Sequence, residues 1–201
     1  ISNNSVPFTA SIISNSKSDD GYYTVSNQME FYAKSDKLLA EFFTESINLA
    51  SEDIENSDIS MDSVIYIVFH AGLSQDFAYP SFDPTIYDLK SAYVDELMME
   101  GINPARIYNK EIKNGIILPE TQNIIYYDVV EDIFGNPNYG TENLCDIQIG
   151  LTGIFAFLLG YHLGLPEMFD IDTGDPGIGY FGLMDHGSNN GRGVIPVPPS
   201  P

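Results

Sequence analysis

Basic residues are scarce in this sequence. Of its 201 residues only 8 are Lys or Arg, against 29 Asp or Glu, so the formal net charge is -21 at pH 7. A surface this acidic repels the phosphates of nucleic acids and the headgroups of anionic membranes. We therefore expect no nucleic-acid partner, and we interpret the charge as a device for solubility.

Cysteine and long apolar runs are also scarce. Cys145 is the only cysteine, so no disulfide can form within the chain, and cysteine usage gives no information on the compartment. The longest apolar run, about Leu151 to Leu165, is too short for a bilayer span and contains His162. No charged-then-apolar leader follows Ile1, which indicates a signal peptide that was removed or that never belonged to this sequence. We expect no membrane insertion.

What is present is the composition of a folded protein, with 43% hydrophobic and 12% aromatic residues. The length suits one large or two small domains, and we expect a single domain over 1–201. The segment 194–201 is rich in proline and is expected to begin a connector, which indicates a domain cut from a longer chain.

The periodicity of apolar residues predicts an α/β (α+β) fold with a mixed sheet. Helical spacing covers 31–53, with Ser35 or Asp36 as the N-cap, and a second, buried helix is expected over 149–163. Continuous apolar runs predict a buried central strand within 61–72 and further strands within 115–120 and 123–130, the last two as a candidate hairpin. Residues 1–30 contain short β-prone pieces, 89–100 fit a short helix or an extended segment, and 131–150 have the composition of a loop.

The run "GIFAFLLGYHLGLPEMFD", residues 153–170, has the rhythm of a zinc-peptidase helix that ends in a turn. Such a helix carries two histidines at i and i+4, because this spacing brings both imidazoles to one metal ion. A glutamate directly after the first histidine is the general base. In one branch a glycine then turns the chain toward a third ligand, and a later methionine turn lies beneath the site.

Counted from Gly164, this chain resembles the secreted immune inhibitor A-type metallopeptidases, a metzincin-like zinc family. Their motif runs His-Glu-x-Gly-His-x-x-Gly-Leu-Pro-Asp and continues to a Leu-Met turn. The resemblance implies a zincin-like fold, an extracellular or cell-surface location, a third ligand position at Glu167 and a methionine turn at Met184. The matching residues are Gly160, Leu163, Gly164, Leu165, Pro166, Leu183 and Met184.

The departures from this family pattern fall on the chemistry. Phe157 and Tyr161 stand at the two histidine positions, Leu158 stands at the general-base position, and Glu167 replaces the usual aspartate. Removing a buried charge together with its partners can be neutral or stabilising, whereas removing only one partner leaves a buried charge unpaired, which is destabilising. The resemblance therefore implies a pseudopeptidase that has lost zinc and catalysis, with no catalytic residues. We expect the side chains of Phe157, Leu158 and Tyr161 to converge toward Glu167 and Met184.

Three functions remain open on the sequence. The pseudopeptidase would be a binding or structural module of a secreted or surface protein, with a peptide or protein in the former cleft beside Glu167, Met184 and His186. The alternative is an active secreted metalloendopeptidase with an unconventional metal site. The third is a purely structural domain whose groove binds nothing.

Other metal sites have weaker support. His162 lies one residue beyond the ligand position, about 100° around the helix from it. A set made of His162, His186, Asp185 and Glu167 has no spacing signature, and Tyr161 with a carboxylate makes a poor zinc site. A glycine-containing loop could wrap calcium with the carboxylates of Asp170, Asp172 and Asp175.

Overall fold

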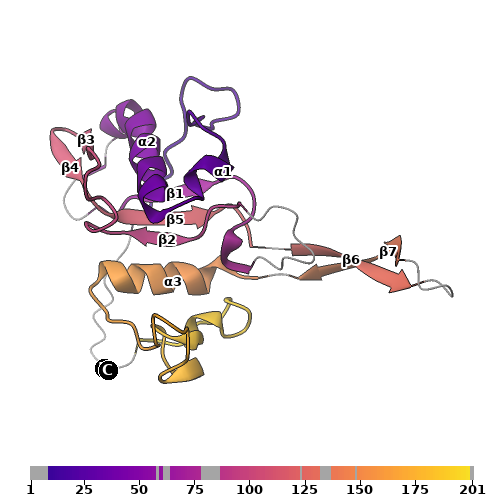
Figure 1. Ribbon diagram of the computed structural model, residues 1–201. Coiled ribbons are helices and arrows are strands. Elements are labelled where there is room, and N and C mark those ends of the chain that lie inside the picture. The colour runs from indigo at the N-terminus through magenta and orange to yellow at the C-terminus, as the bar shows by residue number, and fades with distance from the viewer. Residues whose placement is uncertain are drawn as a thin grey trace.

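The computed structural model describes residues 9–57, 59–60, 64–77, 87–122, 124–131, 137–147 and 149–199. Two helices come first, the strands follow in the middle of the chain, and a third helix with two short 3-10 helices comes last (Figure 1). In chain order they are α1 (Met29–Tyr32), α2 (Asp36–Glu55), β1 (Ile67–His70), η1 (Gln75–Phe77), β2 (Ala92–Val94), β3 (Ala105–Ile107), β4 (Lys110–Ile112), β5 (Gly115–Pro119), β6 (Ile124–Glu131), β7 (Pro137–Ile147), α3 (Leu151–His162), η2 (Gly179–Phe181) and η3 (His186–Asn189).

The centre of the molecule is a three-stranded mixed sheet in the order β1-β5-β2. β1 pairs with β5 in parallel, and β2 pairs with β5 in the antiparallel sense. Every residue of β5 is buried, because it is the central strand and is covered on both faces. The prediction of a buried central strand within 61–72 is wrong, since β1 is an edge strand and its Phe69 is 62% exposed. The α+β class expected from the sequence is confirmed at this level.

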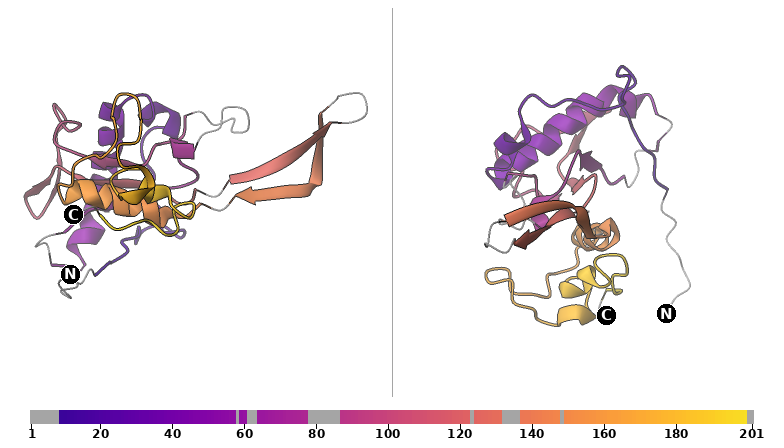
Figure 2. Two further views of the ribbon diagram at one scale, coloured as in Figure 1. Left: turned by 90° about the horizontal axis from the view of Figure 1, so that it is seen from below. Right: turned by 90° about the vertical axis from the view of Figure 1, so that its right-hand side faces the viewer.

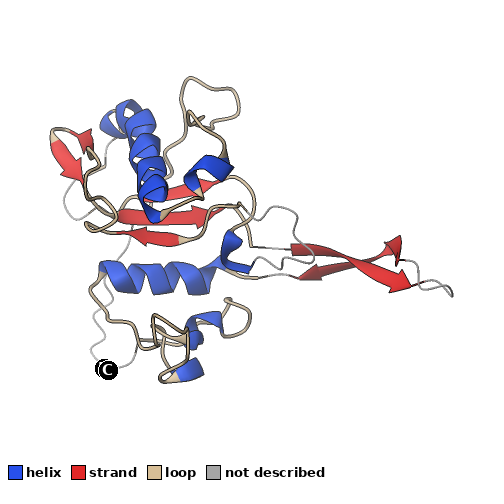
Figure 3. Ribbon diagram, in the orientation of Figure 1, coloured by secondary structure: helices blue, strands red, loops and turns tan. Residues whose placement is uncertain are grey.

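The two faces of the sheet carry different helices (Figure 3). Ile117 of β5 belongs to the larger core, which it shares with Phe43 and Ile47 of α2. Its neighbours in β5, Ile116 and Leu118, form a smaller core with α3 on the opposite face. This division follows from the alternation of side chains along a strand. Helix α3 therefore packs on one face of the sheet, and α2 packs on the other face.

Helix α2 begins and ends close to the predicted bounds. Ser35 is its N-cap, with the side-chain oxygen accepting a hydrogen bond from the Leu38 amide at 3.2 Å. Its buried stripe recurs at three- and four-residue intervals and faces the sheet. The predicted start at 31 is too early, because residues 29–32 form the separate helix α1 and α2 starts at Asp36.

Several predicted elements differ from the structure. The prediction of a loop over 131–150 is wrong, because residues 137–147 form β7, and β6 makes its hairpin with β7 rather than with β5. The β-prone pieces near the N-terminus form no strand within residues 9–28. The segment 89–100 contains strand β2 followed by turns, and the short hairpin of β3 and β4 comes after it.

The segment after α3 lies on the side of that helix away from the sheet (Figures 1 and 2). Two of its carbonyls satisfy the first turn of α3. Gly150 N–H donates to the Arg192 carbonyl and Gly153 N–H donates to the Gly193 carbonyl, each at 2.8 Å. These bonds take the place of a capping side chain, which α3 lacks. In the described part of the chain, no helix has the length and apolarity needed to cross a bilayer.

Candidate functional site

Helix α3 runs from Leu151 to His162 and ends in a turn built on Gly164. Gly164 has a φ of 78°, in the left-handed region that glycine adopts without strain. The Leu165 amide donates to the Gly160 carbonyl and the Gly164 amide donates to the Tyr161 carbonyl, both at 2.9 Å. This pair of bonds is a Schellman motif. The chain thus turns at the glycine that the family pattern indicates and passes back beneath the helix.

The two histidine positions of the family pattern are filled by aromatic rings that meet. Phe157 and Tyr161 pack edge to face, with centroids 4.9 Å apart. Tyr161 also stacks on Tyr93 of β2, with centroids 6.4 Å apart and planes within 9°. Phe157 reaches Phe169 of the following loop at 6.2 Å. The resulting cluster of Tyr93, Phe157, Tyr161 and Phe169 joins the sheet, the helix and the loop.

Leu158, at the general-base position, does not share this direction. It is 4% exposed and packs with Ile116 and Leu118 against the sheet. The expectation that Leu158 converges with Phe157 and Tyr161 toward Glu167 is therefore wrong. Consecutive helical residues differ by about 100° around the axis, so a residue next to Phe157 faces a different neighbour. The expected burial of α3 is also partial: only Gly153, Leu158 and Gly160 are fully buried.

Met184 lies directly against α3. It is 3% exposed, and a Cβ atom added to Gly160 would overlap the Met184 sulfur. The Met168 amide donates to the Met184 carbonyl at 2.9 Å, which ties the descending loop to the methionine segment. Met184 is thus an apolar support beneath the helix, in the place that the resemblance implies, and is too buried to meet a ligand itself.

Glu167 is exposed and lies near the Tyr161 hydroxyl. Burial of the phenol and, to a smaller extent, the negative charge of Glu167 raise the pKa of Tyr161 to about 12. Both effects disfavour the phenolate. Tyr161 is therefore a neutral phenol near neutral pH, which does not suit it to be a metal ligand there.

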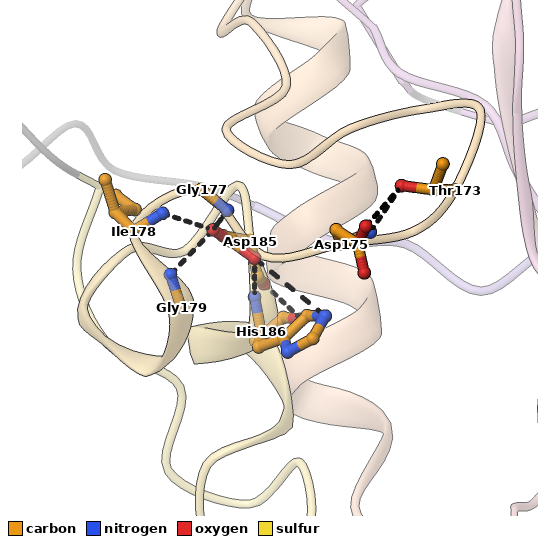
Figure 4. A network of polar contacts seen from close by, with 8 residues as sticks. Thr173, Asp175, Gly177, Ile178, Gly179, Asp185 and His186 are labelled. Atoms are coloured by element: carbon orange, nitrogen blue, oxygen red, sulfur yellow. Dashed lines mark hydrogen bonds and ion pairs between the residues drawn. The ribbon is translucent and has the colours of Figure 1, made fainter.

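A buried carboxylate next to Met184 organises the loop beneath the helix (Figure 4). One oxygen of Asp185 accepts hydrogen bonds from the amides of Gly177, Ile178 and Gly179 at 2.7 to 2.9 Å. The other oxygen accepts from the His186 amide at 2.7 Å. Burial raises the pKa of Asp185, but these four donors outweigh it and hold that pKa below its usual range. The sequence patterns give no indication of this role, because three of the four amides lie six to eight residues before Asp185.

The three histidines do not gather at one place. His186 is partly exposed and packs on Tyr180 at 5.8 Å, with its Nε2 4.0 Å from Asp185. His162 packs edge-on against Tyr93 at 5.9 Å, and its buried Nδ1 has no hydrogen-bond partner in the described chain. His70 is buried at the end of β1, and this burial lowers its pKa.

The proposed calcium loop is closed by its own hydrogen bonds. The Asp170 carboxylate accepts from the amides of Asp172 and Thr173, and these donors lower its pKa. Asp175 accepts from the Thr173 hydroxyl at 2.9 Å (Figure 4). Within the described ranges, no group of three or more His, Cys, Asp and Glu residues is placed to hold a metal ion. Calcium binding stays a prediction.

Two surface hollows lie elsewhere, on the far side of the sheet from α3. One, of about 310 Å³, follows α2 past Glu41, Glu45 and Leu49, and the other, of about 270 Å³, lies against Glu96 and Met99. Ile102 lines both. Comparisons of the chain with protein-family models, with curated proteins and with solved structures find no match.

Proposed function

We propose that this chain is a zincin-like metallopeptidase domain that has lost zinc and catalysis and acts as a binding or structural module of a secreted or surface protein. The observation that carries the proposal is the contact between Phe157 and Tyr161. These two residues occupy the i and i+4 positions of the helix, and their rings meet at 4.9 Å. They occupy the face from which two imidazoles would have to reach an ion.

The surrounding framework also supports the proposal. The turn at Gly164 and the burial of Met184 against α3 support it, because the family motif has a turning glycine and a methionine turn at these positions. The loop of residues 177–179, before Met184, is held by the Asp185 carboxylate through three backbone amides.

The ligand in this proposal is a peptide or protein segment that lies along β2. β2 is an edge strand of the central sheet, and α3 lies beside it. An edge strand offers unpaired backbone groups to an extended segment. Of the three cleft candidates, Glu167 is exposed and His186 is partly exposed, so these two are free to contact such a segment.

Metal content tests the loss of zinc. We expect the purified chain to contain no stoichiometric zinc and to leave casein intact when zinc is added. A variant with Phe157→His and Tyr161→His, and with Glu167→Asp in a second version, is expected to take up zinc. Leu158 is best left in place, because a glutamate there would be buried against the sheet without a partner. Zinc uptake by the unmodified chain, with chelator-sensitive cleavage, would refute the proposal.

Binding separates a module with a ligand from a purely structural domain. Unfolded, carboxymethylated casein is a suitable probe, since it presents many extended segments. We expect it to bind the chain and to bind less well after Glu167→Gln with His186→Ala. Glu30→Gln, an exposed acid in α1, is the matched control and should change nothing. No binding to any extended probe would leave only the structural role.

One observation favours the active alternative, namely the buried and unpartnered Nδ1 of His162. In an unconventional site built on this histidine, zinc would be present in the unmodified chain and would be lost in His162→Ala.

A further inference from the structure

Strands β6 and β7 form an arm that stands away from the rest of the molecule (Figures 1 and 2). They pair with each other from Ile124↔Ile147 to Glu131↔Pro137. Among the described elements, no other helix or strand packs against them to an appreciable extent. With respect to the described elements, the arm is therefore a two-stranded ribbon with both outer edges unpaired.

A ribbon of this kind is only marginally stable by itself in water. Each of its strands has a free row of backbone donors and acceptors on the outer side, which is a template for a further strand. The sequence of β6, "IIYYDVVE", is nevertheless made of residues that favour strands and burial. An arm with this composition gains stability when another strand joins it.

The two edges of the arm are not equivalent. The register shifts between Tyr127 and Val129, which pair with Leu144 and Tyr139. Four β7 residues, 140–143, thus face a single β6 residue, Asp128. Such an irregularity interrupts the edge on which it lies and protects it from pairing. β6 has no extra residues, so its outer edge is the continuous one.

The charge of the arm selects the kind of partner. Its two strands contain four acidic residues, Asp128, Glu131, Glu142 and Asp146, and no basic residue. A second copy would place the same charges side by side, in a chain that already carries a net charge of -21. A segment with basic residues at alternate positions is electrostatically complementary.

We propose that the outer edge of β6, Ile124–Glu131, binds an extended basic segment of a partner protein, which adds a third strand to the arm. The backbone of β6 supplies the hydrogen bonds, and the acidic residues of the arm select the cationic segment. This inference does not depend on the loss of zinc or on a ligand at β2.

The test uses labelled peptides of the length of β6, 8 residues, and fluorescence anisotropy with the full chain. A peptide of alternating Lys and Val is expected to bind at least about tenfold more tightly than one of alternating Lys and Pro. The two carry the same charge, but proline lacks the amide donor of a strand. A peptide of alternating Glu and Val is expected not to bind.

Variants of the arm locate the site. Val129→Pro with Val130→Pro removes one amide from each edge of β6 and is expected to weaken Lys-Val binding about tenfold or more. Asp128→Asn with Glu131→Gln is expected to weaken it and to reduce its salt dependence. The matched control, Asp172→Asn with Asp175→Asn, removes two exposed charges outside the arm and should leave the affinity unchanged.

Three results would overturn the proposal. The first is equal binding of the Lys-Val and Lys-Pro peptides, which would mean charge attraction alone. The second is unchanged binding by the proline variant. The third is a concentration-dependent dimer, seen in sedimentation and abolished by the proline variant, which would assign the edge to a second copy of the chain.

Discussion

The sulfur of Met184 occupies the space in which a side chain at Gly160 would stand. Helix α3 and the segment that carries Met184 therefore approach each other at a distance that only glycine permits. The helix ends two residues later, at His162, and the chain turns at Gly164 toward the same methionine. The contact between Gly160 and Met184 fixes how the C-terminal segment sits on the helix.

Gly160→Ala tests this contact. Within a helix, replacing glycine by alanine ordinarily stabilises by about 1 kcal/mol. Here the added methyl group overlaps Met184, so we expect a net loss of about 1–3 kcal/mol in the free energy of unfolding by urea. Met184→Ala in the same chain should restore part of the loss. Thr152→Ala, exposed on α3, is the control and should change stability little; a stabilised Gly160→Ala would contradict the contact.

Leu158→Ala tests whether the side chain at the general-base position is packed against the sheet. Because Leu158 is packed between α3 and the sheet, we expect the substitution to lower the free energy of unfolding by urea by about 2–5 kcal/mol. Leu163→Ala, the same change at a leucine that is 63% exposed, should cost less than about 0.5 kcal/mol. Equal effects of the two substitutions would show that Leu158 is not in the core.

Asp185→Asn tests the buried carboxylate. The substitution removes the negative charge to which four amides donate hydrogen bonds. We expect it to lower the free energy of unfolding by about 2–3 kcal/mol at neutral pH. The folded pKa of Asp185 is depressed, so its contribution is present above the unfolded value of about 3.9 and disappears as pH falls through the folded pKa. The difference between the two proteins should shrink in that acid range. Asp172→Asn, at an exposed acid, should show no such difference.

Tyr161→Phe tests the raised phenol pKa. The folded pKa is about 12, against about 10 for an unfolded tyrosine, so the unfolded chain loses its proton first as pH rises. Tyr161 thus makes the unmodified protein lose stability between about pH 10 and pH 12, relative to the phenylalanine variant. Ultraviolet titration of the two proteins should differ by a single tyrosine that ionises near pH 12. A difference that appears near pH 10 would contradict the burial.

The sequence predicts those parts of the fold that depend on local pattern. The stripe of α2, the apolar run of β1 and the fully buried β5 each have a period or a length that indicates one structure. The sequence does not predict β7, because Gly140 and neighbouring asparagines give this segment the composition of a turn. Strand β6 could form a hairpin with either of its neighbours in the chain, β5 or β7. Hydrophobic periodicity does not distinguish between these two partners.

In the candidate site, too, local features are predictable from the sequence and tertiary contacts are not. The end of α3 at Gly164 comes from the glycine and proline that follow the apolar run, and the structure has this turn. The role of Met184 comes from the resemblance alone. The direction of Leu158 depends on how far α3 is rotated against the sheet, which the spacing along one helix does not determine. The role of Asp185 depends on three amides from a segment six to eight residues earlier, whose approach is a tertiary event.

The carboxylate of Asp185 has a consequence for the motions of the surface loop that it binds. Gly177 and Ile178 are exposed, and exposed loop amides ordinarily exchange their hydrogens with water rapidly. These amides instead donate to a buried acceptor, so exchange requires the Asp185 contact to open first. A stretch that looks like free surface should therefore open and close together with the floor beneath α3, as one cooperative unit.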